Sequence, residues 1–180
     1  RPATQDRYAA VQPKTKAEVL KHDLVAGARS RHGDRQLEIT AATFTNHLEV
    51  HDREVPLGGR ACIRLLLRAN QPVACPAVGM QLFDRMANLI FSAGTPQLKF
   101  PLAPLAAGQE IMLDFHLGFE VQPGEYTLGL DAGELGPAGP NTGFFHDRIT
   151  GLGPITVTLD QHTPFPFFGA ARLPLEISHV

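Results

Sequence analysis

Apolar and polar residues alternate along most of this chain from residue 37 onward. Alternation with a period of two marks short strands with one buried face, because successive side chains of a strand point to opposite sides. Clusters of turn-forming residues, such as Pro56-Leu57-Gly58-Gly59, separate the runs. No helix–strand alternation is present, so we predict an all-β domain, an antiparallel β-sandwich of the immunoglobulin-like or jelly-roll-like kind. The predicted strands are 37–44, 60–68, 73–83, 89–92, 110–119, 126–131, 155–160 and 173–177.

The first 36 residues differ from the rest in pattern and charge. They carry eight Lys and Arg against four Asp and Glu, whereas the remainder carries eight against fourteen. We therefore divide the chain into a linker, 1–36, and a β-sandwich domain, 37–180, whose negative balance disfavours nucleic-acid binding. The linker contains one short predicted helix at 15–25, with Thr15 as its cap and an apolar stripe formed by Ala17, Val19, Leu20 and Leu24.

Two later segments raise questions that the pattern leaves open. The Gly/Pro-rich stretch 133–143 is expected to be a mobile connection. The run Thr-Pro-Phe-Pro-Phe-Phe-Gly at 163–169 is too aromatic to remain in water, so we expect its own sandwich or another chain to cover it.

Size and cysteine content limit the class of protein. A chain of 180 residues with 43% hydrophobic content is enough for one packed domain, and no run approaches the roughly 18–20 apolar residues of a membrane span. The chain starts at Arg1 with neither an initiator Met nor a signal peptide, so we expect a fragment of a longer protein. Cys62 and Cys75 flank a strand–loop–strand junction where a disulfide is conceivable, but two scattered cysteines favour a reduced pair.

Motifs for catalysis and cofactor binding are missing from the sequence. No Lys follows the Gly-rich pattern of an ATP-binding loop, and no Gly-x-Ser-x-Gly elbow is present. His47 and His51 are four apart in a predicted strand and loop, where that spacing would not place both on one metal-binding face. No pair of carboxylates is singled out for glycoside hydrolysis. We predict no cofactor, no metal site and no catalytic residue.

Two motifs together resemble a known family. Residues 76–95 read Pro-Ala-Val-Gly-Met-Gln-Leu-Phe-Asp-Arg-Met-Ala-Asn-Leu-Ile-Phe-Ser-Ala-Gly-Thr, a β-hairpin with its turn at 84–88. About thirty residues later, Pro-Gly-Glu-Tyr-Thr-Leu at 123–128 starts another strand. Their order and spacing resemble the C-terminal domain of Wzt, the nucleotide-binding subunit of bacterial O-antigen ABC transporters, over roughly residues 37–178. Two positions depart from the family pattern: Ala87 or Asn88 stands where the turn has Gly, and Ser92-Ala93-Gly94 replaces Gly-Thr-Asn.

This resemblance implies a non-catalytic domain that binds the modified non-reducing end of a completed O-polysaccharide. Binding would occur in the cytoplasm at the inner membrane and would present the polymer for ATP-driven export. The implied partners are the polysaccharide, the ATPase domain that joins the linker, and the transmembrane subunit. The resemblance also implies a homodimer in which the last strand, predicted at 173–177, is exchanged between the two chains.

Strand alternation also predicts which side chains face outward. If Ile63, Leu65 and Leu67 point inward, then Arg60, Cys62, Arg64, Leu66 and Arg68 point outward, and the same rule places Met112 and Asp131 outside. Polar side chains on such a face can hydrogen-bond sugar hydroxyls, and the Arg row slightly favours an acidic terminal group. The chain has no Trp, so stacking on a sugar ring falls to Phe83, Phe144 or Phe145. Our candidates for carbohydrate binding are Arg64, Gln81, Phe83, Asp114, His116 and Thr127.

Other interpretations of the same residues stay open. An adhesion or scaffolding sandwich would dock a protein through its edge strands and the aromatic cluster at 165–168, and a polysaccharide-modifying jelly roll ranks third. Tyr126 is expected in the core with its hydroxyl bonded to the backbone, and His146-Asp147-Arg148 is expected to form a structural corner.

Overall fold

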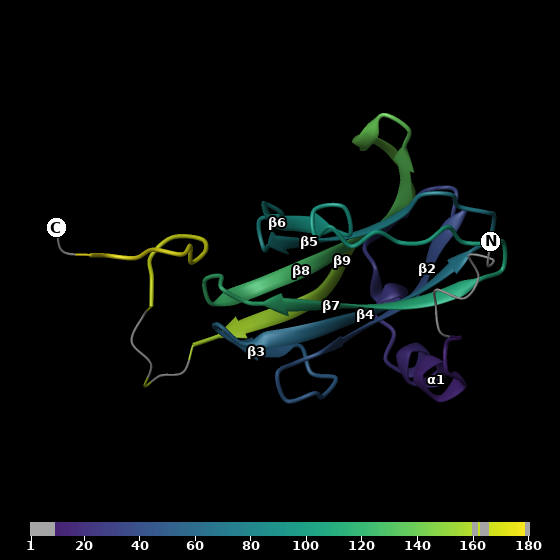
Figure 1. Cartoon of the computed structure of the whole chain (residues 1–180). Helices are drawn as coiled ribbons and strands as arrows, with labels where there is room; N and C mark the ends of the chain where they lie inside the picture. Colours follow the sequence, from purple (N-terminus) through teal and green to yellow (C-terminus); the bar gives the residue numbers. More distant parts are fainter. Residues whose placement is uncertain (1–9, 160–161, 163–165, 179–180) are drawn as a thin grey trace.

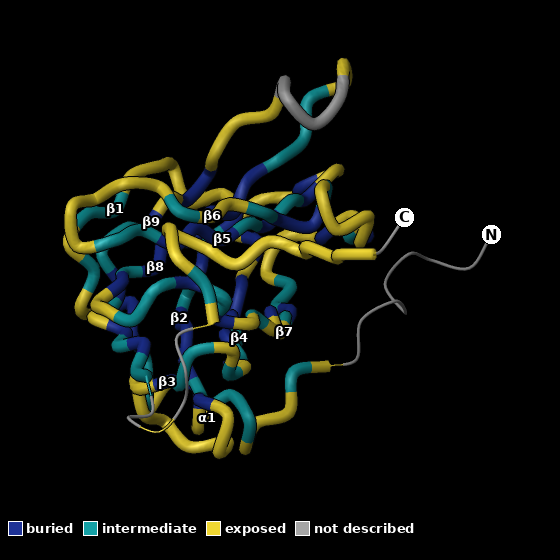
Figure 2. Tube along the Cα trace, turned by 90° about the vertical axis from the view of Figure 1, so that its left-hand side faces the viewer, coloured by how far each residue is buried: buried dark blue, intermediate teal, exposed yellow. Residues whose placement is uncertain are grey.

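Two β-sheets pack face to face in the computed structural model, which describes residues 10–159, 162 and 166–178 (Figure 1). The predicted antiparallel β-sandwich is confirmed. Alternate apolar residues of both sheets fill the space between them, where Figure 2 shows the buried residues. Among the described residues, no helix is long and apolar enough to cross a membrane.

The larger, six-stranded sheet has its strands in the order β1, β9, β8, β5, β6, with β3 paired in parallel to β9. The other neighbours are antiparallel. The bounds are β1 Ser30–His32, β3 Glu54–Pro56, β5 Pro76–Asp84, β6 Leu89–Gly94, β8 Gly124–Gly136 and β9 Gly139–Thr158.

The three-stranded sheet has the order β2 (Leu37–Thr45), β4 (Arg60–Ala69), β7 (Glu110–Gly118). Its register places Ile63 of β4 opposite Phe44 of β2 and Phe115 of β7. All three side chains belong to the core, as the alternation predicted.

A short helix, α1 (Pro13–Lys21), covers part of the outer face of the three-stranded sheet (Figure 1). The helix begins earlier than predicted, because Gln12 is its cap and Pro13 occupies the first turn, so Thr15 is not the cap. Val19 packs on Ala41 and Leu66 of the sheet. Leu66 points outward as predicted, yet it is only 1% exposed because the helix lies over it. After α1, a single 3-10 turn, η2 (Val25–Gly27), leads to β1.

Strand β1 lies inside the stretch that we assigned to the linker. It pairs with β9, and Arg31 of β1 reaches the buried carboxylate of Asp147 with Nη2 2.7 Å from Oδ2. The same carboxylate accepts the backbone N–H of Ile39 in the opposite sheet at 2.9 Å. Asp147 thus forms the structural corner that we expected. The division of the chain at residue 36 stays a prediction, although these contacts join residues 30–32 to the sandwich.

The expected mobile connection at 133–143 is instead a β-hairpin. Strand β8 continues to Gly136 and β9 starts at Gly139, so only two residues separate them. The hairpin projects from the sandwich as an arm (Figure 1). Gly and Pro were read as loop residues there, but Gly133 meets β9 so closely that a Cβ atom would lie 2.3 Å from the carbonyl oxygen of Phe144. Glycine therefore serves close strand pairing at this position.

Two further strand predictions need adjustment. Strand β5 starts at Pro76, because Val73 instead forms an isolated bridge with Leu105. Residues 173–177, predicted as a final strand, belong to no sheet. Instead, the segment extends away from the body with Leu173, Leu175 and Ile177 at 77%, 86% and 94% exposure (Figure 1). A strand needs a partner edge, and this segment pairs with none in the part of the chain that the structure describes.

The core also confirms the role predicted for Tyr126. Its side chain is buried, and its hydroxyl donates to the carbonyl oxygen of Gln122 at 2.6 Å. This tie between a strand and the turn before it is typical of immunoglobulin-like sandwiches. Both cysteines are free thiols, as we favoured.

Candidate functional site

The two sheets divide the six candidate residues into two groups of three. Arg64, Asp114 and His116 lie on β4 and β7, on the outer face of the three-stranded sheet. Gln81, Phe83 and Thr127 lie on β5 and β8, on the outer face of the six-stranded sheet. The two faces are on opposite sides of the core, so the six residues do not form one site.

On the three-stranded sheet, Arg64 and Asp114 bind each other. The guanidinium donates through Nε and Nη2 to both carboxylate oxygens, each at 2.7 Å. This hydrogen bonding to Asp114 raises the pKa of the Arg64 guanidinium. Cys62 lies beside the pair opposite His116, and burial raises the pKa of the Cys62 thiol. Because each partner satisfies the other, this Arg is engaged and does not stand ready to bind an acidic sugar.

On the six-stranded sheet, Gln81 and Asp131 form a buried polar pair. Each is 6% exposed, and Gln81 Nε2 donates to Asp131 Oδ2. The residue opposite Gln81 on β8 is Gly129, and a Cβ atom there would lie 2.5 Å from Gln81 Oε1 and 3.0 Å from Phe83. Glycine at this position therefore leaves the space in which the Gln81 amide lies across the sheet.

A groove of about 370 Å³ opens above this pair. Its floor includes Gly79 of β5, where no side chain rises from the sheet, and Ser92 of β6 lies opposite Gln81. Phe83 and Thr127 form the next cross-strand pair on the same face but do not line the groove. Of the six candidates, Gln81 alone contributes to it.

The projecting arm supplies aromatic walls. Phe144 and Phe145 line the groove and are 57% and 55% exposed. The Arg148 guanidinium lies over the Phe145 ring, 4.9 Å from its centroid, and Arg148 Nε is 3.3 Å from Asp131 Oδ1. The ring of Phe144 meets that of buried His146 edge-on at 5.1 Å. An exposed aromatic face beside buried polar groups is an arrangement suited to sugar rings and their hydroxyls.

Two buried oxygens in the groove lack hydrogen bonds among the described residues, namely Gln81 Oε1 and Asp131 Oδ1. Burial raises the pKa of the Asp131 carboxyl, while the Arg148 charge and the Gln81 hydrogen bond oppose that rise. A buried acceptor without a hydrogen bond costs about 1–3 kcal/mol, so each of these two oxygens can gain a hydrogen bond from a donor that enters the groove.

Sequence reasoning found part of this groove. It placed Asp131 on the outer face without selecting it, and it named Phe144 and Phe145 only as possible stacking residues. Arg148 was assigned to a structural corner, but only Asp147 and His146 act there: His146 is buried, and its Nδ1 lies 2.8 Å from Asp34 Oδ1. Ser92 carried no signal, because a serine in an exposed strand is ordinary; its place opposite Gln81 depends on the register of β5 and β6.

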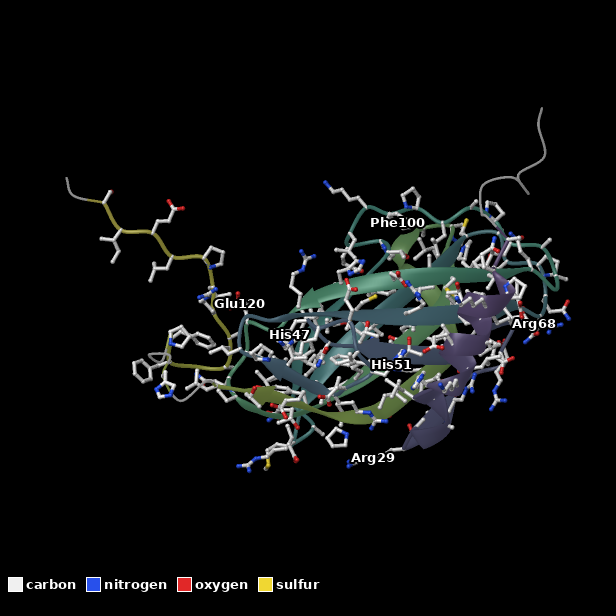
Figure 3. All side chains as sticks on the ribbon, turned by 90° about the horizontal axis from the view of Figure 1, so that it is seen from below. Arg29, His47, His51, Arg68, Phe100 and Glu120 are labelled. Carbon is white, nitrogen blue, oxygen red and sulfur yellow. The ribbon has the colours of Figure 1, made fainter. Side chains whose placement is uncertain are left out.

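A second, larger groove of about 600 Å³ opens along the edge of the sandwich. It is lined by residues of β6, the loop after it and β7, including Phe91, Leu98, Phe100, Phe115 and Leu117. Phe100, labelled in Figure 3, is 57% exposed. Three of the six candidates, Arg64, Asp114 and His116, also line this groove. Its lining is mainly apolar, which suits an apolar segment better than a sugar.

Comparison with known proteins identifies the fold and the family. The family model described as the Wzt C-terminal domain matches residues 28–173, well over half of the chain. A crystal structure of the C-terminal domain of Wzt superposes with a TM-score of 0.71 at 12% identity, covering 88% of this chain and 96% of that one. The CARDB domain of a Pyrococcus furiosus protein, solved in complex with di-metal ions, gives a TM-score of only 0.36 at 14% identity, over 69% of this chain and 94% of that one. No curated protein matches the sequence.

The family match includes every strand from β1 to β9, and so all the strands that carry the two grooves. Domains of this family bind substrate and are not catalytic, and no ATPase fold occurs among the described residues. The chain belongs to the Wzt C-terminal domain family, which has a carbohydrate-binding role in O-antigen transport by an ABC transporter.

Proposed function

We propose that this domain recognises the modified non-reducing end of a completed O-polysaccharide, and that it does so in the groove over Gln81 and Asp131. The observation that carries the proposal is the pair of buried oxygens, Gln81 Oε1 and Asp131 Oδ1, which make no hydrogen bond among the described residues, although Arg148 Nε lies 3.3 Å from Asp131 Oδ1. Sugar hydroxyls are donors of the required kind. The exposed faces of Phe144 and Phe145 supply the apolar contact that a pyranose ring needs.

The size of the groove supports recognition of an end rather than of a long stretch of polymer. Its volume of about 370 Å³ is near the lower limit of small-molecule pockets, roughly 300–1,000 Å³. That space suits one or two sugar residues. Bound there, the terminal residue would signal that the polymer is complete and ready for export.

The charges in the groove favour a neutral terminal group. The Arg row that slightly favoured an acidic cap lies on the other sheet, where Arg60 and Arg68 are exposed and Arg64 is paired with Asp114. The charged residues that line the groove itself are two carboxylates, Asp131 and Glu134, and Arg148 offsets the first of them with its Nε 3.3 Å from Asp131 Oδ1. Hydrogen bonds to hydroxyl groups, rather than a salt bridge, would therefore select the cap.

Titration with capped and uncapped polysaccharide tests this proposal. Gln81→Ala removes an acceptor, and Gly79→Val fills the groove floor, because a Cβ atom at residue 79 meets only ordinary contacts at 3.5 Å or more. We expect each variant to weaken binding of the capped polymer by about tenfold or more, the value of one or two hydrogen bonds to a ligand. The wild type should bind the uncapped polymer much more weakly.

Arg64→Ala on the opposite sheet is the matched control and should bind as the wild type does. If Arg64→Ala abolishes binding while Gln81→Ala and Gly79→Val bind normally, the site lies on the other face. If the wild type ignores both polymers, the carbohydrate proposal is wrong and protein docking becomes the better account.

We also propose that the domain forms a homodimer by exchange of its C-terminal segment. Leu173, Leu175 and Ile177 alternate along an extended segment and are 77–94% exposed, which a single chain in water does not favour. The groove between β6 and β7 is apolar, and β7 is the edge of its sheet. The segment of a second copy would add a strand to β7 and fill that groove. A dimer would bring two polysaccharide sites together and raise avidity.

Light scattering tests the dimer. Leu175→Asp places a charge on the apolar side of the segment and should yield a monomer, whereas Glu176→Lys, on the other side, should leave the dimer intact. A monomeric wild type, or a dimer that survives Leu175→Asp, would contradict the exchange. In the transporter, we expect the dimer to act with the ATPase domain and the transmembrane subunit at the cytoplasmic side of the inner membrane.

A further inference from the structure

The sequence drew attention to His47 and His51 as a possible pair of metal ligands. The fold instead brings His51 next to Glu18 and His22. Figure 3 labels His51 next to the α1 ribbon. Glu18 lies on that helix, and His22 is the C-cap residue directly after it, four residues later, where its ring contacts the Glu18 carboxylate. His51 comes from the loop between β2 and β3. We propose that Glu18, His22 and His51 form a binding site for Zn²⁺.

The three ligand atoms already lie close together. Glu18 Oε1 is 3.3 Å from His22 Nε2 and 3.3 Å from His51 Nε2. The same carboxylate oxygen, Glu18 Oε1, therefore contacts both imidazole rings. A charge-assisted hydrogen bond is usually about 2.7–2.9 Å long, so both contacts are longer than that.

The observed spacing fits a tetrahedral zinc ion. Ligands about 2.0–2.1 Å from the metal at tetrahedral angles lie roughly 3.3 Å from one another. The two oxygen–nitrogen distances match that edge. The imidazole rings are stacked, with centroids 3.8 Å apart and planes 8° from parallel, so both must tilt toward a shared ion. Side-chain exposures of 31% for His22 and 25% for His51 leave room for that adjustment.

The chemistry of the three ligands selects the metal class. Two imidazoles and one carboxylate form a set that zinc binds, with a water molecule completing four-coordination. Mg²⁺ and Ca²⁺ prefer oxygen ligands and are poor competitors at such a site.

The loop that carries His51 is held in place by its own hydrogen bonds. The Asn46 side chain accepts the backbone N–H groups of Leu48 at 2.9 Å and Val50 at 3.4 Å. The Asn46 side-chain amide also donates to the carbonyl oxygen of Glu54 at 3.2 Å. These contacts fix the shape of the loop that carries His51. A zinc ion would join the helix and the loop, and would thereby hold α1 on the three-stranded sheet.

A second cluster, Cys62, Asp114 and His116, is weaker as a metal site. Both oxygens of Asp114 already accept hydrogen bonds from Arg64 at 2.7 Å. Zinc binds a thiolate, and burial raises the pKa of the Cys62 thiol. A metal there must first break the ion pair and deprotonate the thiol, so this cluster serves as the control.

Calorimetric titration of the tag-free chain with Zn²⁺ tests the site. We expect one zinc ion per chain and no heat of binding with Mg²⁺. Loss of even an outer-shell partner lowers metal affinity by about 10–100-fold, so His22→Gln or His51→Gln should weaken binding by at least that factor. Glu18→Gln should weaken it in the same direction. His47→Gln in the same loop and His116→Gln in the other cluster should retain the wild-type affinity.

Hydrogen exchange supplies a readout that reports the location of the ion. Zinc should slow exchange of the α1 amides in the wild type and in His47→Gln, but not in His51→Gln. Absence of zinc binding to the wild type overturns the proposal. So does binding that His116→Gln abolishes while His22→Gln and His51→Gln retain it.

Discussion

Replacing Arg31 by methionine tests whether β1 is an integral part of the sandwich. The Arg31 guanidinium donates to both carboxylate oxygens of Asp147, at 2.9 and 2.7 Å, and to the carbonyl oxygen of Ile39 at 3.0 Å. Hydrogen bonding to Asp147 raises the pKa of Arg31, so the cation is held in the folded state. Methionine keeps most of the apolar stem and removes the charge.

The expected loss follows from the burial of the partner that remains. Asp147 is 0% exposed. In Arg31→Met its carboxylate loses both hydrogen bonds from the guanidinium and keeps the one from the Ile39 N–H at 2.9 Å. Removing one member of a buried ion pair costs about 3–5 kcal/mol. Domains are stable by about 5–15 kcal/mol, so this is a large fraction of the total. At about 2–4 °C per kcal/mol for a chain of this length, the melting temperature should fall by roughly 6–20 °C.

Arg64→Met is the matched control, because Arg64 and Asp114 form the same two-bond pair at 2.7 Å on the other sheet. Their side chains are 38% and 31% exposed, so water screens the pair and its loss should cost at most about 1 kcal/mol. Urea unfolding of both variants measures the difference. Equal losses within about 0.5 kcal/mol would refute the argument from burial, and a negligible loss in Arg31→Met would show that β1 is dispensable.

Three further predictions concern single side chains. Asp131→Asn should weaken polysaccharide binding without loss of stability at neutral pH. Burial raises the pKa of Asp131, so this carboxyl group stabilises the folded state below the ordinary carboxyl pKa of about 4. That contribution is lost as the pH rises through the raised pKa. Between pH 4 and pH 8 the melting temperature should fall less with rising pH in Asp131→Asn than in the wild type, and an equal fall would contradict this reasoning. Ala87→Gly should raise the free energy of unfolding by about 0.5–1 kcal/mol, because Ala87 has φ 63° in the turn where the family pattern has Gly, whereas Ala77→Gly within β5 should lower it. Tyr126→Phe removes the 2.6 Å hydrogen bond to Gln122 and should cost about 0.5–1.5 kcal/mol in chemical denaturation, and an unchanged midpoint would refute a structural role for the hydroxyl.

The fold class and the inward or outward direction of most strand residues could be predicted from the sequence. Strand geometry places alternate side chains on opposite faces, so Ile63, Leu65 and Leu67 had to share the buried side of β4. Tyr126 was predictable for the same local reason, together with the Pro-Gly turn before it. Each of these inferences uses only residues that are neighbours in the sequence.

The sequence by itself also determined which polar and aromatic side chains lie on the outer faces of the sheets. Only the tertiary structure decided which of them are close to one another. Alternation tells the face of a residue and not its sheet, so Arg64 and Gln81 looked like members of one site. Gln81, Asp131 and Arg148 come together because β5, β8 and β9 are adjacent, and pairing between strands is set by contacts far apart in the chain. The same holds for Arg31 with Asp147, for Leu66 under α1, and for His51 beside Glu18, where packing between distant segments decides what a local pattern leaves open.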